Sequence, residues 1–459
     1  MKTNPAGGFA SIDEQPFKGF HWRAILTTGL GVFTDGYDLS SIGIVLPLVL
    51  MSFGVKSISS LEGAMLAGSA LVGAAVGALI FGFLAQNGRK RFYGLDVLLM
   101  GIAAIAQAFA PNLAWLIGIR FVLGIGIGAD YVLSPTIMAE HANRAHRGRA
   151  LGLGFGTMWP LGALVAGVLN LLLSNLGFSP DMQWRIVLAF GAVPALSVLY
   201  LRRTMPETAR YLARLAGDPG AATGVMQTIS GERTARAPAR DERPFGEVFS
   251  KHASVVFRAA LLWMVFDIVV YSGILFGPSL IAKGLGISPI VFTLFIQIIF
   301  QLPSSLFYSF FLIDGAGRKP VQVWGFVGAA VLLVAFVLLK PMLAALPFAA
   351  LTVYGLYNVA INGPGIVSGT GILGVELAPT RIRTVAQSIT VVGGRIGASI
   401  SAFLFPLLFA RIGETGVILL LAGLSVVGAI LTQVLVPETS GVSLEALNGD
   451  HEEAMPARA

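Results

Sequence analysis

The sequence lacks cysteine and is poor in charged residues. With no cysteine among 459 residues, disulfide bonds, thiolate catalysis and cysteine-ligated metal sites are excluded. Charged residues make up 12% of the chain, about half the share expected of a soluble protein. The chain also lacks a phosphate-cradling glycine-rich loop, which argues against ATP as an energy source. None of the five histidines lies inside a long apolar segment, so protons crossing such a segment would have to be carried by carboxylates.

The chain is rich instead in long apolar segments. Hydrophobic residues make up 55% of it, and the mean hydropathy is +0.79. Twelve segments have about the 20 residues that a helix needs to cross a bilayer. They span residues 24–51, 62–86, 92–110, 113–140, 149–175, 183–203, 258–282, 290–313, 320–339, 347–377, 385–410 and 415–436. We therefore expect an all-α membrane protein with twelve transmembrane helices, and short surface helices near 220–229 and 245–252.

The basic residues predict the orientation of these helices. Of the 31 lysines and arginines, five fall on one side of the expected membrane. Two, Arg120 and Arg395, are expected within the membrane itself, away from the segment ends, and the remaining 24 fall on the other side. Positively charged loops stay in the cytoplasm, so this second side, with both termini, is expected to be cytoplasmic. The net charge of +7 then reflects topology in a plasma (inner) membrane rather than nucleic-acid binding.

The chain repeats itself after about 230 residues. Three motifs in the first half recur 229, 236 and 231 residues later. They are Gly88-Arg89-Lys90 with Gly317-Arg318-Lys319, Glu140 and Arg147 with Glu376 and Arg383, and Pro206-Glu207-Thr208 with Pro437-Glu438-Thr439. We expect two parallel-repeat six-helix bundles, at 1–203 and 258–439, joined by a central cytoplasmic loop at 204–257 and followed by a tail at 440–459. In this geometry a solute binds at mid-membrane between two halves that rock.

Two carboxylates lie in the middle of the first apolar segment. Asp35 and Asp38 are three residues apart, so they share one helix face. At about 1.5 Å per residue they lie roughly 18–22 Å into the segment, near the membrane centre. Charge at this depth is costly and usually faces a water-filled path. We interpret the pair as functional; the alternative is a structural pair satisfied by neighbouring helices.

A second candidate group lies in the seventh segment. Trp263, Asp267 and Tyr271 are spaced four residues apart and form one stripe on a helix. Indole and phenol groups donate hydrogen bonds while presenting apolar faces, so the stripe can bind a small polyoxygenated solute. Arg395 in the eleventh segment offers a planar fork of donors to a carboxylate or phosphate. The alternatives are an aromatic packing seam and a structural ion pair.

Asp130 lies about 17 residues into the fourth segment, beside Tyr131. Burial disfavours the charged form of a carboxylate, so Asp130 can hold a proton at neutral pH. A nearby arginine would oppose this. If Arg395 approached Asp130 in only one conformation, protonation and conformation would become linked, which we state as a hypothesis.

Several motifs match a known family. The chain resembles the major facilitator superfamily from about Phe20 to Leu447. The matching stretches are Asp314 with Gly317-Arg318-Lys319, Arg120-x3-Gly124-x3-Gly128, Pro206-Glu207-Thr208-Ala209-Arg210-Tyr211-Leu212 and Pro437-Glu438-Thr439-Ser440-Gly441. The last two are similar to the sugar-porter signatures that end each half.

Within that superfamily the chain is similar to phosphate:proton symporters. The stretches are Phe33 to Leu39, Gly126 to Tyr131 with Ser134 to Glu140, Trp263-x3-Asp267-x3-Tyr271, Glu376 to Arg381, and Gly394 to Ala398. The resemblance implies proton-handling acids at Asp35, Asp38 and Asp130. It implies substrate contacts at Tyr131, Trp263, Asp267 and Tyr271, and Arg395 stands where that group tends to have a lysine. Met158 replaces a glutamine of the group, and Asn358 and Asn362 are out of register with its asparagine.

The remaining charged residues are interpreted as structural or gating. Glu140, Arg147, Glu376 and Arg383 recur at cytoplasmic helix ends, where we expect salt bridges that latch the two halves. Arg89, Asp314 and Arg318 belong to the repeated loop motif, and Arg120 is expected to hold the first bundle together. The stretch from Asn362 to Gly371 is the most helix-breaking of any expected span, which fits equally a kinked or broken helix that lines the cavity and a site of close helix packing.

Together these features predict a proton-coupled symporter of a small anion working by alternating access, with inorganic phosphate as the leading substrate. A sugar and an organic or aromatic acid are the alternatives. A solute sensor, a membrane enzyme and a drug exporter are the rival classes. The sensor would need a large output domain, the enzyme a nucleophile or cofactor site, and the exporter an apolar cavity. We expect a monomer that is not an enzyme, with no cofactor, no metal and no nucleic-acid partner.

Overall fold

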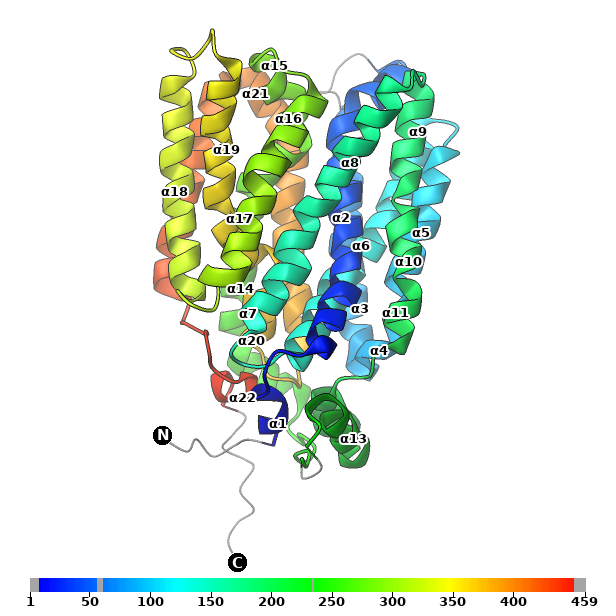
Figure 1. The fold of residues 1–459 in the computed structure, drawn as a ribbon, viewed down its shortest axis with the longest axis vertical. Coiled ribbons are helices and arrows are strands. Elements are labelled where there is room, and N and C mark those ends of the chain that lie inside the picture. The colour runs from blue at the N-terminus through cyan, green and yellow to red at the C-terminus, as the bar shows by residue number, and fades with distance from the viewer. Residues whose placement is uncertain (1–7, 56–60, 233–234, 450–459) are drawn as a thin grey trace, which may run out of the picture.

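The computed structural model describes residues 8–55, 61–232 and 235–449 of the chain. Every regular element in these residues is a helix. The long helices run alongside one another in two groups (Figure 1). The first and last described helices, α1 (Ala10–Asp13) and α22 (Leu444–Leu447), lie with α13 (Pro219–Ser230) at one end of the bundle. We call this the lower end, and it is the end that the sequence predicts to be cytoplasmic.

The first group contains six membrane spans. Its elements are α2 (Gly19–Ser52), α3 (Leu61–Leu84), α4 (Arg89–Phe92) with α5 (Leu95–Ala108), α6 (Leu113–His141), α7 (Arg147–Leu151) with α8 (Met158–Asn175), and α9 (Pro180–Phe190) with α10 (Ala192–Ser197) and α11 (Leu199–Thr204). A π-helical turn, Gly152–Thr157, joins α7 to α8. The short α12 (Ala209–Tyr211) precedes α13 below the bundle.

The second group repeats this order. Its elements are α14 (Phe245–Phe276) with α15 (Ala282–Gly284), α16 (Pro289–Phe295) with α17 (Leu302–Phe307), α18 (Arg318–Leu339), α19 (Pro347–Pro364) with α20 (Ile372–Glu376), and α21 (Arg383–Leu435). The π-helical turns Gly277–Ile281, Ile296–Gln301 and Tyr308–Leu312 continue α14, α16 and α17.

The described residues contain ten helices that are long and apolar enough to cross a membrane. One of them, α21, is 53 residues long and has a non-helical glycine, Gly413, where two helices meet. This junction divides α21 into two spans. The span built from α19 and α20 is not among the ten, because its polar residues lower its hydropathy. Adding this span and the second span of α21 to the ten gives twelve. The twelve expected spans are therefore confirmed.

The central loop differs from expectation at one point. Helix α13 confirms the expected helix near 220–229. The expected separate helix at 245–252 is instead the start of α14, which continues unbroken to Phe276. The lower part of α14 packs against the start of α21 and the segment before it, and this apolar contact stabilises the extension of the helix below the membrane. The buried residues in contact are Val248, Val256, Ala378, Ile382 and Ala386. The expected boundary at 257/258 falls inside this helix.

Small residues bring α3 and α6 close together. A side chain on Gly124 or Gly128 of α6 would collide with the backbone of Ala70 or Ala74 on α3. Gly73 and Gly77 of α3 meet the backbone of α6 in the same way. Such small-residue faces drive helix association in a bilayer, where van der Waals contact replaces the hydrophobic effect.

The expected break after Asn362 is present. Helix α19 gives way to a π-helical turn, Gly365–Gly369, and Gly371 takes a positive φ of 76° before α20 begins. Only glycine adopts this backbone conformation without strain. The broken segment lines the central cavity, as expected.

Candidate functional site

A central cavity lies between the two groups of helices. It is lined by Val32, Tyr131, Phe155, Gly156, Trp159, Pro160, Phe266, Asp267, Val270, Tyr271, Ile274, Gln301, Asn362, Gly365, Ile366, Gly369, Thr370 and Arg395. Its space for the centres of water-sized molecules is about 70 Å³. One water needs about 10–15 Å³ on this scale, so the cavity suits a solute of a few non-hydrogen atoms.

Arg395 stands at the centre of one wall. Its Nη1 donates to Tyr271 Oη over 2.5 Å and lies 3.9 Å from Asp267 Oδ2. Its guanidinium carbon lies 4.4 Å from the centre of the Tyr131 ring, a cation–π contact. Trp263 Nε1 donates to Asp267 Oδ1 over 3.2 Å, but Trp263 does not line the cavity. The expected stripe therefore lies on one face, with Asp267 and Tyr271 exposed to the cavity and Trp263 behind them.

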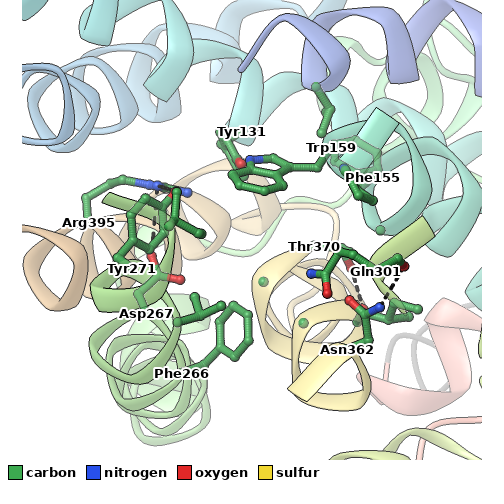
Figure 2. A pocket seen from close by; sticks show the side chains of 18 residues that line it. Tyr131, Phe155, Trp159, Phe266, Asp267, Tyr271, Gln301, Asn362, Thr370 and Arg395 are labelled. Carbon is green, nitrogen blue, oxygen red and sulfur yellow. Dashed lines mark hydrogen bonds and ion pairs between the residues drawn. The ribbon is translucent and has the colours of Figure 1, made fainter. Parts of the chain in front are cut away.

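Neutral polar groups form the opposite wall. Figure 2 shows Gln301, Asn362 and Thr370 across the cavity from Arg395, Asp267 and Tyr271. Asn362 Nδ2 donates to Ser304 Oγ over 2.6 Å and to the backbone carbonyl oxygen of Gln301 over 3.0 Å. Gln301 Oε1 has no hydrogen-bond partner among the described residues. Gln301 was not predicted as a site residue, although an amide two residues before a proline inside an apolar segment was a signal.

The first half contributes mainly aromatic and apolar side chains. Phe155 and Trp159 face the cavity from the π-turn and α8, and Tyr131 faces it from α6 (Figure 2). Met158, which stands where the resemblance implies a glutamine, packs toward Gly29 of α2 and does not line the cavity. Apart from the Tyr131 hydroxyl and the Trp159 indole N–H, the polar groups of the lining side chains come from the second half.

Asp35 and Asp38 are buried in α2 and do not line the cavity. Neither carboxylate has a hydrogen-bond partner among the described residues. Asp38 faces Gly191, where a side chain would collide with it. Burying an ionised carboxylate without a partner is costly, so these two sites favour the neutral, protonated acid.

Asp130 is paired with an arginine that the sequence analysis missed. Arg202 Nη2 donates to Asp130 Oδ1 over 2.7 Å, while its Nη1 donates to Asp96 Oδ2. In this conformation Asp130 is paired with Arg202 and not with Arg395, so an approach of Arg395 to Asp130 in another conformation stays a hypothesis. Arg202 is followed by Arg203 at the end of its span, where two neighbouring arginines are typical of a cytoplasmic flank, so its position did not mark it as buried. It is nevertheless fully buried.

Ion pairs cross between the halves at the lower end. Arg383 Nη1 lies 2.9 Å from Glu140 Oε1, and Arg147 Nε lies 2.7 Å from Glu376 Oε1. The two acids are also paired within their own halves, Glu140 with Arg89 at 3.3 Å and Glu376 with Arg318 at 3.0 Å. Asp314 accepts from the backbone N–H groups of Gly148 and Arg149 across the interface. The expected latch residues thus form two buried clusters, one around Glu140 and one around Glu376, each of which contains an arginine from both halves.

Two further buried arginines, Arg120 and Arg210, hold neighbouring elements together. Arg120 donates to the Leu66 carbonyl and to Gln107 Oε1, each over 3.1 Å, inside the first bundle. Arg210 joins α12 to both ends of the described chain, with pairs to Asp13 at 2.8 Å and Glu445 at 2.7 Å. Burial alone would raise the pKa of Glu445, but the charge and hydrogen bonds of Arg210 outweigh it and lower that pKa to about 2.

The sequence matches a family model over nearly its whole length. The model is described as "Sugar (and other) transporter" and covers residues 24–450. The chain belongs to this transporter family. Its members are transporters and not enzymes, and no cluster of His, Asp or Glu in the described residues is placed to hold a metal ion. The transporter is a multi-pass membrane protein.

Curated relatives match the transporter from end to end. It is 30% identical to the "Probable inorganic phosphate transporter 1-6" of Arabidopsis thaliana, over 96% of each chain. It is 32% identical to the "Probable inorganic phosphate transporter 1-12" of Oryza sativa subsp. japonica, over 97% of this chain and 95% of the relative. The "Low affinity inorganic phosphate transporter 5" of Petunia hybrida is 31% identical, over 98% and 96%.

Solved structures share the transporter's fold. The "MFS (major facilitator superfamily) proton:xylose symporter XylE bound to 6-bromo-6-deoxy-D-glucose" superposes with a TM-score of 0.79, over 94% of this chain and 99% of that one. The inward-open form of XylE from E. coli gives 0.69. Both are 22% identical to this chain, which shows the fold alone. The transporter therefore has the twelve-helix major facilitator fold.

Proposed function

We propose that the transporter is a proton-coupled symporter of a small oxyanion, with inorganic phosphate as its substrate. The observation that carries the proposal is Arg395. Arg395 is the one permanent cation among the residues lining the described cavity, and Asp267 is the one acid. A planar guanidinium binds phosphate through two parallel hydrogen bonds. The curated relatives named as phosphate transporters support this choice.

The two halves divide the work in this proposal. Arg395, Asp267, Tyr271, Gln301 and Asn362 bind the solute from the second half. The first half carries the proton on its buried acids Asp35, Asp38 and Asp130. A proton on a buried carboxylate removes its charge and lowers the cost of closing the path around it. Opening and closing of the lower-end ion pairs then exposes the cavity to one side at a time.

Neutral sugar is the second candidate. Asp267 lies 3.9 Å from Arg395 and balances its charge when ionised. Gln301 and Asn362 offer uncharged donors and acceptors of the kind that hydroxyl groups need. A phosphate anion instead requires Asp267 to be protonated, or displaced from Arg395, when the anion binds.

Uptake into proteoliposomes tests the proposal. Labelled phosphate is expected to accumulate against its gradient when protons flow inward, and not without a proton gradient. A labelled hexose and a labelled benzoate, offered under the same gradient, are expected to stay at background. Accumulation of either of them with no phosphate uptake would refute phosphate as the substrate and leave the symport mechanism standing.

Asp35→Asn separates coupling from binding. The amide cannot release a proton, so gradient-driven accumulation is expected to fall to background. Exchange of internal for external phosphate needs no net proton movement and is expected to persist. Accumulation at the wild-type rate in Asp35→Asn would contradict the role assigned to this acid.

We propose further that the protein is a monomer in the plasma (inner) membrane, with both termini in the cytoplasm. The excess of lysine and arginine at the lower end supports this orientation. Protease accessibility of tags at the two ends, in sealed right-side-out vesicles, tests it. Tags that stay protected agree with the assignment, and tags that are cleaved invert it.

A further inference from the structure

Arg202 is shared by two carboxylates inside the first bundle. Its two terminal nitrogens donate to Asp130 on α6 and to Asp96 on α5. All three side chains are fully buried. The guanidinium carbon also lies 4.2 Å from the centre of the Tyr93 ring. This triad, Asp96, Arg202 and Asp130, has two acids for one base.

The two acids of the triad are held differently. Asp96 accepts from the backbone N–H of Gly94 through Oδ1 and from Arg202 through Oδ2, so both of its oxygens are occupied. Asp130 accepts from Ser134 and Arg202 through Oδ1 alone, over 2.5 and 2.7 Å. Its Oδ2 has no partner among the described residues. Asp130 can therefore take a proton on Oδ2 without losing a hydrogen bond, whereas Asp96 cannot.

Asp130 Oδ2 points to the helix that carries the unpaired acids. A side chain on Gly31 of α2 would collide with both Asp130 Oδ2 and Arg202 Nη2. Asp35 lies one turn further along α2 and is within electrostatic reach of Asp130 and Arg202. The free oxygen of Asp130 is thus beside an acid proposed to carry protons.

Few other charged or titratable groups lie close enough to influence the protonation of Asp130. The titratable and charged side chains that face the triad are Asp35 from α2, Tyr93 from the α4–α5 turn and, through Asp35, Asp38 of α2 and Arg395 of α21. Helix α3 carries one acid, Glu62, at its opposite end, and α8 carries no charged residue. Arg202 is then the nearest cation to Asp130.

A shared arginine solves a problem of buried charge. If Arg202 had Asp130 as its one counter-ion, protonating Asp130 would leave an uncompensated cation in the protein interior. Leaving one member of a buried ion pair uncompensated is strongly unfavourable, which would hold Asp130 in its ionised form. Because Asp96 accepts from the other terminal nitrogen, Arg202 keeps a paired carboxylate while the charge of Asp130 changes.

We propose that Asp96 is a positioning residue for proton coupling, which keeps Arg202 neutralised whenever Asp130 carries the transported proton. The inference rests on the proposed proton symport. Asp130 binds a proton on Oδ2 from the outer side and releases it to the lower end, and Asp96 and Arg202 keep their protonation throughout the cycle. Asp96 thus sets the pH at which Asp130 loads without itself moving a proton.

Two substitutions shift this loading in opposite directions. Asp96→Asn leaves Asp130 as the one counter-ion of Arg202, so the midpoint of phosphate uptake against external pH is expected to move down by about one pH unit or more, a tenfold change in proton affinity. Arg202→Gln removes the cation, so the midpoint is expected to move up. Asp241→Asn removes an ion-paired acid of the central loop and is the matched control, with the wild-type midpoint expected.

A second measurement covers variants that no longer transport. The infrared carbonyl band of a protonated carboxyl, assigned by its loss in Asp130→Asn, gives the loading midpoint in purified, monodisperse protein without turnover. Midpoints of Asp96→Asn and Arg202→Gln equal to that of the wild type, or shifted in the same direction, would overturn the inference. If wild-type uptake shows no proton dependence, the proposed symport itself fails, and the variants are not needed to decide it.

Discussion

At the scale of single residues, the arrangement of polar groups in the cavity wall depends on the planar side chain of Arg395. Arg395 contacts the Tyr131 ring, the Tyr271 hydroxyl and Asp267 at the same time. Its Nε has no hydrogen-bond partner among the described residues, so this N–H remains for a solute. A lysine has the same charge but lacks the planar fork, and it cannot fill all these positions.

Arg395→Lys tests this requirement. A hydrogen bond to a charged group contributes about 1.5–3 kcal/mol, so losing one is expected to raise the KM for phosphate at least tenfold. The maximal rate is expected to change less, because the positive charge remains. Arg411→Lys, at an exposed position near the end of the same span, is the control and is expected to keep the wild-type KM. Equal KM values for wild type and Arg395→Lys would exclude a bidentate contact.

At the scale of elements, the spacing of helices is set by glycines that face another backbone. Gly128 of α6 has no room for a side chain against Ala74 of α3, whereas Gly118 of the same helix has nothing within 4 Å. The two positions differ only in what lies opposite them. Asp130 lies two residues after Gly128, so the same close approach fixes where α6 presents its acid.

Gly128→Val tests the close approach. The added methyl groups must push α3 and α6 apart, so the yield of monodisperse protein after detergent extraction is expected to fall severalfold and the melting temperature to drop. Gly118→Val on the same helix is expected to behave like the wild type in fluorescence-detected gel filtration. Equal losses in both variants would attribute the effect to valine in the helix rather than to packing.

At the scale of the whole molecule, ion pairs connect the two halves below the cavity. The halves meet around the cavity mainly through uncharged contacts, while the lower end carries the pairs Arg147–Glu376 and Arg383–Glu140. Alternating access requires these buried pairs to open together. Replacing Arg147 leaves Glu376 paired with Arg318 of its own half alone, so an ion pair between the halves is lost and the closed lower end is destabilised.

Arg147→Gln is expected to shift the protein toward a conformation open at the lower end. The chain has no cysteine, so spin labels can be attached through Asn87→Cys and Ala316→Cys, one in each half. The distance distribution is expected to gain a longer component in Arg147→Gln. Arg185→Gln, which breaks a pair within the first half, is expected to leave the distribution unchanged. An unchanged distribution in Arg147→Gln would remove this pair from the latch.

The contacts of Arg210 make stability depend on pH. The folded pKa of Glu445 is about 2, below its ordinary value, because Arg210 outweighs burial, which acts in the opposite direction. A depressed carboxylate pKa stabilises the fold above the unfolded value of about 4.3, and this stabilisation is lost as the pH falls toward 2. The pKa of the neighbouring Asp13 is raised, chiefly by burial, so its protonation on acidification favours the fold.

Glu445→Gln is therefore expected to lower the melting temperature in detergent at pH 6. The difference from wild type is expected to shrink as the pH falls from about 4.5 toward 2, where Glu445 itself becomes protonated. Glu242→Gln, an exposed acid of the central loop, is expected to match the wild type at each pH. A difference that grows on acidification would contradict the assigned sign.

The sequence by itself determined the number of spans, the repeat and the presence of Asp35, Asp38, Asp130, Asp267 and Arg395 as charged residues within the spans. These follow from local properties: helix length against membrane thickness, the distribution of lysine and arginine, and the spacing of Trp263, Asp267 and Tyr271 on one face. It also indicated the break after Asn362, because glycine and proline act on their own turn.

Only the tertiary structure decided which charges meet. Spacing along a helix fixes a face but not its neighbour, so Asp130 could be assigned to Arg395 until the fold placed Arg202 beside it. Asp96, Arg202 and Gln301 were inconspicuous for the same reason: each derives its environment from helices that are distant in sequence. The partner of a buried charge depends on how the helices pack against one another. The spacing of side chains along a single helix does not determine that packing.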